Sequence, residues 1–163
     1  MDYQTAYQQL TGSTVFQHWK KSHPGVYLSH LYSGLTNDFS LGTWEIGFYH
    51  PDHDTITTFI VDREISKKPE EGIFKKGGVV DELSLSQVTV NQQQALRQYL
   101  ELYQKKYSRL ALLKGFLVLQ ALDEQPLWNV SFVTREFTVL NVKIDAASGE
   151  VLHDELITVA ERK

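Results

Sequence analysis

The sequence matches itself when it is shifted by 84 residues, and this internal repeat constrains the fold more than any other feature. Within 41 ungapped positions the shift aligns seven identical residues, and several further positions keep their apolar character. Two of the identities are aromatic, since Trp44 falls on Trp128 and Phe48 falls on Phe132. Self-similarity of this kind is typical of a structural unit that occurs more than once. The 163-residue chain is therefore predicted to contain two tandem copies of one small fold.

The second half of the chain predicts a helix followed by an antiparallel meander. Apolar residues recur three or four positions apart from Ala95 to Tyr107, which is the spacing of one helix face. Asn91 and Gln94 have the spacing of a capping box at the start of that helix. Strands are expected at 110–120, 127–133 and 137–144, with a short final strand between 151 and 157.

The first half follows the same plan. One helical stripe runs from Tyr3 to Trp19 and includes Val15, and Gly12 with Ser13 is expected to bend or split the helix. Strands are expected at 26–32, 43–49 and 55–61. The predicted fold class is α+β, with two tandem helix-plus-antiparallel-meander (αβββ) repeats that pack together. Residues 1–66 form the first unit, 67–84 a charged linker with Lys75, Lys76, Gly77 and Gly78, and 85–163 the second unit.

Composition excludes several classes of protein. The chain has no cysteine, which removes thiol nucleophiles, thiolate metal sites and disulfides together. Its net charge is −4 and neither half is basic, so nucleic acid is not an expected partner. No run of 18 apolar residues is present, so no membrane span is expected. Without a secretory signal at Met1–Thr5 the expected location is cytoplasmic. An extracytoplasmic location is the alternative, if a native signal or anchor is missing.

The second half resembles the PepSY or PepSY-like family. The resemblance rests on Trp128-x-Val130-x-Phe132, on a following strand that ends in Ile144-Asp145, and on the turn from Ser148 to Val151. It covers roughly residues 88–157, and the first half matches it through Trp44-x-Ile46-x-Phe48 and Phe59-x-Val61-Asp62. The resemblance implies a cystatin-like αβββ unit. It also implies a role in binding or inhibiting peptidases, or in regulating protein partners outside the membrane.

The densest polar cluster lies between two predicted strands. Imidazole and carboxylate groups are suitable ligands for Zn²⁺ or another divalent ion, and the candidate metal ligands are His50, Asp52, His53 and Asp54. The favoured interpretation of the same segment is a hairpin turn around Pro51. We therefore predict no metal, no cofactor and no catalytic residue.

Other polar and aromatic residues have structural interpretations. A Ser-His-Asp set can be drawn from His23 or His30, Ser29 or Ser33, and Asp38, but no Gly-x-Ser-x-Gly sequence accompanies it. We expect His23 to cap the end of the first helix, because a cation is favoured there. Trp44 and Trp128 are expected in the core rather than in a ligand site.

The expected function is that of a non-enzymatic module that binds a protein or peptide partner, with a peptidase inhibitor as one form. An exposed sheet edge is the predicted docking place. The alternative is a small-molecule-binding protein or a metal-dependent enzyme that uses a helix–sheet cavity or the turn from His50 to Asp54. A structural homodimer joined through sheet edges is a third hypothesis.

Overall fold

The computed structural model describes residues 1–72 and 80–159 of the chain. It is an α+β fold, as the sequence predicts. The helices are α1 (Tyr3–Thr11), α2 (Thr14–Lys21) and α3 (Gln92–Lys106), with a 3-10 turn η1 (Leu85–Gln87). The strands are β1 (Tyr27–Thr36), β2 (Leu41–His50), β3 (Thr55–Val61), β4 (Ile65–Lys67), β5 (Glu71–Gly72), β6 (Leu112–Leu122), β7 (Gln125–Thr134), β8 (Thr138–Asp145) and β9 (Val151–Thr158).

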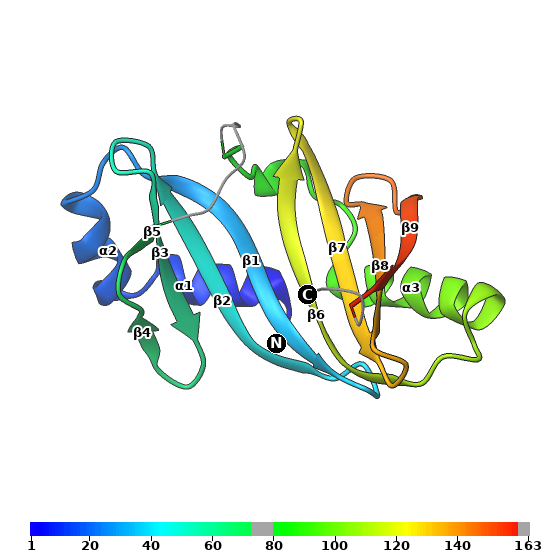
Figure 1. The fold of residues 1–163 in the computed structure, drawn as a ribbon. Helices are drawn as coiled ribbons and strands as arrows, with labels where there is room; N and C mark the ends of the chain where they lie inside the picture. The colour runs from blue at the N-terminus through cyan, green and yellow to red at the C-terminus, as the bar shows by residue number, and fades with distance from the viewer. Residues whose placement is uncertain (73–79, 160–163) are drawn as a thin grey trace.

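These strands form one antiparallel sheet in which the two halves of the chain join edge to edge. The order is β4-β3-β2-β1-β6-β7-β8-β9, and β5 pairs with β3 beside β4. The first long strand of each half, β1 and β6, therefore lies at the centre of the sheet. Helices α1 and α3 lie on the same side of it, each behind the strands of its own half (Figure 1). One hydrophobic core runs beneath them across both halves.

The core is built from the alternating residues of the strands. On β2 one row of alternating buried side chains is Trp44, Ile46 and Phe48, and on β7 the similar row is Trp128, Val130 and Phe132. Successive side chains of a strand point to opposite faces, so this alternation places one row against the helices. Burial of these rows confirms the strand pattern predicted from the sequence.

Trp44 and Trp128 are core residues, as the sequence predicts. Trp44 is 1% exposed and Trp128 is fully buried. The indole Nε1–H of Trp44 donates to the Met1 carbonyl at 2.9 Å, and that of Trp128 donates to the Val90 carbonyl at 2.8 Å. Each hydrogen bond ties the middle of a strand to the residue that precedes a helix N-cap. The bonds therefore fix where each helix crosses the sheet.

Caps define the helix starts. Asp2 accepts from the Thr5 N–H at the start of α1, and Asn91 and Gln94 form the predicted capping box at the start of α3. The buried residues of α1 are Tyr3, Ala6 and Leu10, and those of α3 are Gln92, Ala95, Leu96 and Tyr99. The spacing of three and four residues turns one face of each helix toward the sheet.

The first helix is split at Gly12 and Ser13, as predicted. The Ser13 Oγ accepts from the Phe16 N–H at 3.1 Å and so begins α2 as a separate helix. Phe16 and Trp19 are buried, but Val15 is 48% exposed, which corrects its expected place on the stripe. Val15 lies one residue, about 100° of helix rotation, from Phe16 and therefore faces away from the core.

Other elements differ in extent from their predictions. Strand β1 ends four residues past its expected limit, and β2 and β7 extend one or two residues at each end. Strand β3 has the expected bounds, β6 is shifted by two residues and β8 by one, and the final strand is continuous from Val151 to Thr158. The short β4, β5 and η1 were not predicted, because two or three residues carry no readable periodicity. Within the expected linker 67–84, Leu83 is buried and its N–H donates to the Leu28 carbonyl at 2.9 Å. The expected linker residues Lys75, Lys76, Gly77 and Gly78 lie outside the described residues.

A search of the described helices finds none that combines the length and the hydropathy needed to cross a bilayer.

Candidate functional site

Two histidines and a glutamate meet where β2 turns into β3. His50, the last residue of β2, is only 3% exposed, whereas His53 lies exposed in the turn. Their rings are stacked, with centroids 5.7 Å apart and planes at 9°. Glu70 lies beside them because β5, which follows it, pairs with the start of β3. One ligand atom from each of the three residues lies within 4.8 Å of the others.

The structure brings together only two of the four candidate metal ligands that the sequence analysis names. His50 and His53 come together, and residues 51–54 form the expected turn, closed by the Asp54 N–H that donates to the His50 carbonyl at 2.8 Å. Neither Asp52 nor Asp54 belongs to the cluster, and the Asp54 carboxylate instead accepts from the Tyr49 hydroxyl. Glu70 was missed because it lies 17 residues from His53, with no motif linking the two.

Hydrogen bonds and burial set the charge of this cluster. His53 Nδ1 lies 3.3 Å from Glu70 Oε2, and the Thr55 hydroxyl donates to the same carboxylate oxygen. That hydroxyl is the main reason why the pKa of the Glu70 carboxyl is lowered, and His53 adds to the effect. Burial lowers the pKa of His50, and the nearby His23 and His53 lower it further against the opposing charge of Glu70. A neutral imidazole beside a carboxylate is a suitable donor set for a divalent transition metal.

His23 lies next to this cluster. Its Nδ1 is 2.8 Å from the Trp19 carbonyl, so the ring caps the end of α2, as the sequence predicts. The His23 ring also stacks on Trp19 and meets the His50 ring edge-on at a centroid distance of 5.4 Å. His23, His50, Asp52 and His53 line a pocket of about 170 Å³.

The Ser-His-Asp set drawn from the sequence is not assembled. Ser29 Oγ lies 3.1 Å from His30 Nδ1, but Asp38 lies past the other end of β1. The Asp38 carboxylate accepts from the Thr36 hydroxyl in its own turn. Asp38 therefore does not join the Ser29–His30 pair, and the carboxylate whose charge acts on His30 is that of Glu45.

The helix–sheet cavity expected in the alternative function has a counterpart beside α3. It is a groove of about 670 Å³ between α3 and the loop that joins β1 to β2. Its apolar lining includes Phe39, Leu96 and Leu100, and Leu100 is 37% exposed there. Arg97 and Asp38 stand among the polar lining residues.

The face of the sheet opposite the helices carries a second, more polar hollow of about 400 Å³. His30 lies across Gly47 here, and a Cβ at position 47 would come within 2.2 Å of the imidazole ring. Lys68 Nζ pairs with Glu45 Oε1 at 2.7 Å on the same face. Glycine at position 47 is therefore what allows a histidine ring to lie flat on this face.

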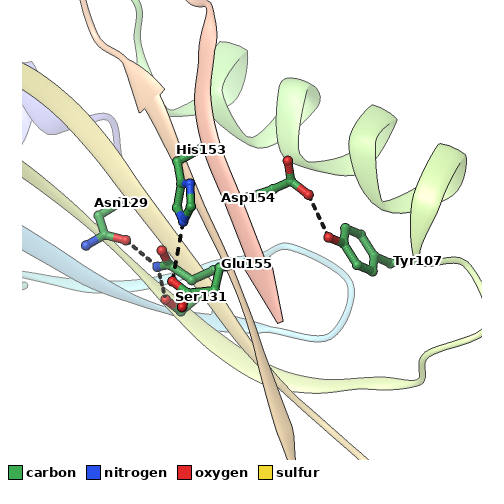
Figure 2. A network of polar contacts seen from close by, with 7 residues as sticks. Tyr107, Asn129, Ser131, His153, Asp154 and Glu155 are labelled. Carbon is green, nitrogen blue, oxygen red and sulfur yellow. Dashed lines mark hydrogen bonds and ion pairs between the residues drawn. The ribbon is translucent and has the colours of Figure 1, made fainter. Parts of the chain in front are cut away.

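Strand β9 forms one outer edge of the sheet, and its Asp154 is tied to the end of α3 (Figure 2). The Tyr107 hydroxyl and Lys106 Nζ both donate to Asp154 Oδ2, at 2.6 and 2.8 Å, and so tie β9 to the end of α3. His153 lies 3.4 Å from Glu155 on the opposite face. Asn141, which lies opposite Glu155 on β8, donates its side-chain amide to Asn129 and Ser131 on β7.

The backbone of β9 bonds to β8 on one side only. The Val159 N–H donates to the Phe137 carbonyl at 3.0 Å, just past the end of β9. Hydrogen-bonded positions alternate along an antiparallel strand, so the N–H and C=O groups of Asp154, Leu156 and Thr158 point away from β8. No other strand in the described ranges pairs with this side. Large apolar side chains are exposed at or beside this edge, namely Leu152 (46%), Ile157 (42%) and Val159 (40%).

Comparison with known proteins identifies a fold and no family. No family model matches the sequence, and no curated protein matches it. Among solved structures, the chain is similar to the 1.85 Å crystal structure of a "putative lipoprotein" from Clostridium difficile 630. The TM-score is 0.52 at 12% sequence identity, over 87% of this chain and 90% of that one. At this identity the similarity establishes a shared α+β architecture.

Proposed function

We propose that this chain is a non-enzymatic module, built from two tandem PepSY-like αβββ units, that binds a protein or peptide partner along β9. The unpaired backbone edge of β9 is the observation that carries the binding proposal. The repeat proposal rests on the symmetry of the central strand pair and on matched contacts in the two halves.

The pairing of β1 with β6 has the symmetry expected of two equivalent units. Ser33 pairs with Leu117, which is its counterpart under the 84-residue shift. On either side of that pair, Tyr32 lies opposite Val118 and Gly34 lies opposite Phe116. Because Phe116 corresponds to Tyr32 and Val118 to Gly34, each contact occurs twice, once in each direction. Such a self-complementary interface is the kind that joins the two subunits of a symmetric dimer.

The two halves also share their contacts between strand and helix. In each half a buried tryptophan of the second long strand donates to the carbonyl that precedes the helix N-cap. The helix starts are 89 residues apart, as for Tyr3 and Gln92, whereas the tryptophans are 84 apart. The uniform shift therefore misaligns the helices by five residues, because the first half has a longer, split helix.

An edge strand is a suitable place for a partner to bind. An extended peptide can add to it through main-chain hydrogen bonds, while neighbouring side chains supply specificity. Asp154, Leu156 and Thr158 would offer those backbone groups, and the exposed Ile157 and Leu152 would supply apolar contacts. The opposite edge of the sheet offers fewer unpaired backbone groups, since β4 has only three residues. The resemblance to PepSY domains agrees with a protein partner.

The test compares two proline variants at opposite edges. Thr158→Pro removes an outward N–H from β9, and proline is tolerated where the N–H faces solvent. Lys67→Pro is the matched control on β4. The Lys68 N–H donates to the Thr58 carbonyl of β3, so the N–H of the preceding residue, Lys67, points away from the sheet. Immobilised wild type and both variants are incubated with cytosolic and with extracytoplasmic fractions of the source cells, since both locations stay predictions. We expect a protein that wild type and Lys67→Pro retain and that Thr158→Pro loses. Equal retention by all three chains, or none by wild type, would show the proposal to be wrong.

A further inference from the structure

The cluster of His50, His53 and Glu70 has an arrangement that the peptide-binding proposal does not use. It is the one group of three possible metal ligands in residues 1–72 and 80–159. The pair His153 and Glu155 on β9 shows the contrast, because its atoms are 3.4 Å apart but no third ligand joins them. The ion pair of His53 and Glu70 alone therefore does not explain why His50 lies beside it.

Distances within the cluster suit a small divalent ion. Bonds of about 2.0–2.2 Å in tetrahedral geometry place two ligand atoms roughly 3.4 Å apart. His53 Nδ1 and Glu70 Oε2 already lie 3.3 Å apart. The remaining separations are at most 4.8 Å. His53 and Glu70 are exposed, so small rotations of their side chains toward the buried His50 can shorten these separations.

Hydroxyl groups next to the cluster provide the support that metal ligands require. His50 Nε2 lies 2.7 Å from Thr57 Oγ1, and the hydroxyl oxygen can accept the Nε2–H. His50 Nδ1 then carries the lone pair that a metal binds. A hydrogen bond from the second ring nitrogen to an oxygen is the usual way in which a ligating histidine is oriented. The Thr55 hydroxyl orients Glu70 by donating a hydrogen bond to its carboxylate.

We propose that His50, His53 and Glu70 form a binding site for one divalent transition-metal ion of the zinc class. Two imidazole nitrogens and one carboxylate oxygen favour such ions, whereas Ca²⁺ and Mg²⁺ prefer sets of oxygen ligands. Three protein ligands leave at least one coordination position for water or for a ligand from another molecule. The adjoining pocket of about 170 Å³, lined by His23 and Asp52, leaves room for that ligand.

The test is calorimetric titration of ZnCl₂ into the full-length chain after treatment with a chelator, at pH 7.5. We expect saturable binding of one Zn²⁺ per chain. His53→Ala and Glu70→Gln each remove a ligand from an exposed position, so the fold survives and the affinity falls by at least about tenfold. His18→Ala is the matched control, because it removes an exposed imidazole on α2 outside the cluster. The affinity of His18→Ala for Zn²⁺ should equal that of wild type.

Three outcomes would overturn the proposal. They are the absence of saturable binding to wild type, wild-type affinity in both His53→Ala and Glu70→Gln, and an equal loss in His18→Ala. Circular dichroism of each variant confirms that the fold is intact before titration. Titration with MgCl₂ tests the class of metal, since binding of Mg²⁺ as tight as that of Zn²⁺ would contradict the assignment.

Discussion

Single residues fix two of the helices to the sheet. Trp44 and Trp128 each bury an indole and direct its N–H to a backbone carbonyl just before a helix. A buried carbonyl that loses its donor is costly, because no water replaces the lost hydrogen bond. These two side chains therefore contribute through both packing and hydrogen bonding.

Replacing either tryptophan by phenylalanine tests this role. We expect Trp128→Phe to lower the free energy of unfolding by about 1–3 kcal/mol, the cost of an unsatisfied buried acceptor. The loss in Trp44→Phe should be smaller, because its acceptor belongs to Met1, which is 56% exposed, and water can replace the lost donor there. Trp19→Phe is the control, because within the described ranges Trp19 is buried but its indole nitrogen makes no hydrogen bond. Urea denaturation followed by circular dichroism measures all three. A loss for Trp19→Phe as large as for Trp128→Phe would contradict the hydrogen-bond argument.

His30 makes the stability of the fold depend on pH. Burial lowers the pKa of His30, and the nearby Glu45 only partly opposes this. Below the ordinary value of 6.5 the unfolded chain binds a proton that the folded chain does not. Stability is therefore fully present above pH 6.5 and is lost as the pH falls toward the lowered value.

The variant His30→Gln should lose less stability than wild type as the pH falls from 7.5 to 5. His50 shifts in the same direction and keeps its contribution in both proteins, so the difference between the two curves isolates His30. Urea midpoints at half-unit pH intervals give the curves. Parallel curves for wild type and variant would contradict the assignment.

How far the candidate site can be predicted depends on the distance between its residues in the chain. His50 and His53 are near neighbours, and their residue types alone suggest a metal. Glu70 reaches them only because a two-residue strand, β5, pairs with β3. So short a pairing leaves no pattern in the sequence. The sequence therefore suggests the carboxylates of Asp52 and Asp54 as candidate ligands, because they are the acidic residues closest to His50 and His53 in the chain.

At the scale of elements, local signals in the sequence predict the helices well. The capping box of Asn91 and Gln94, the split at Gly12 and the alternation around Trp128 all depend on residues a few positions apart. The one helix residue that was placed wrongly is Val15. It is apolar yet exposed, since it lies one position from the buried Phe16 and the helix turns it outward.

The cap of α3 offers a test at this scale. Asn91→Ala removes the side chain that accepts from the Gln94 N–H, and we expect a loss of about 1 kcal/mol in the free energy of unfolding. Gln93→Ala, at an exposed position in the same turn, is the matched control and should change stability little. Thermal and urea unfolding both report the difference. Equal stability of Asn91→Ala and wild type would show that the cap is energetically neutral.

At the scale of the whole molecule, the two halves share both a sheet and a core. Tyr3 of α1 meets Trp128 of β7 edge-on at 5.6 Å, and Phe39 stacks on Phe132 at 4.9 Å. The sequence predicts that the halves pack together, because one helix and a few strands make a thin core. It does not predict their orientation, since nothing in either half's own pattern distinguishes β1 and β6 as the strands that pair.

This interface predicts that the two halves reassemble when they are separated. Fragments 1–72 and 80–163, coexpressed with a tag on one of them, should copurify in equal amounts. Phe39→Asp places a charge against Phe132 and should abolish the copurification. Phe137→Asp is the control, because Phe137 is 70% exposed. Soluble fragments that fail to copurify would contradict this account of the interface.

The unequal outer strands of the sheet also affect how copies of this protein can associate. Strand β9 has eight residues and β4 has three, so a head-to-tail contact between copies would overlap along very little backbone. Growth of an open-ended filament requires that contact to be repeated at every step. Two copies that paired through β9 would instead cover the long edge of both and form a closed dimer.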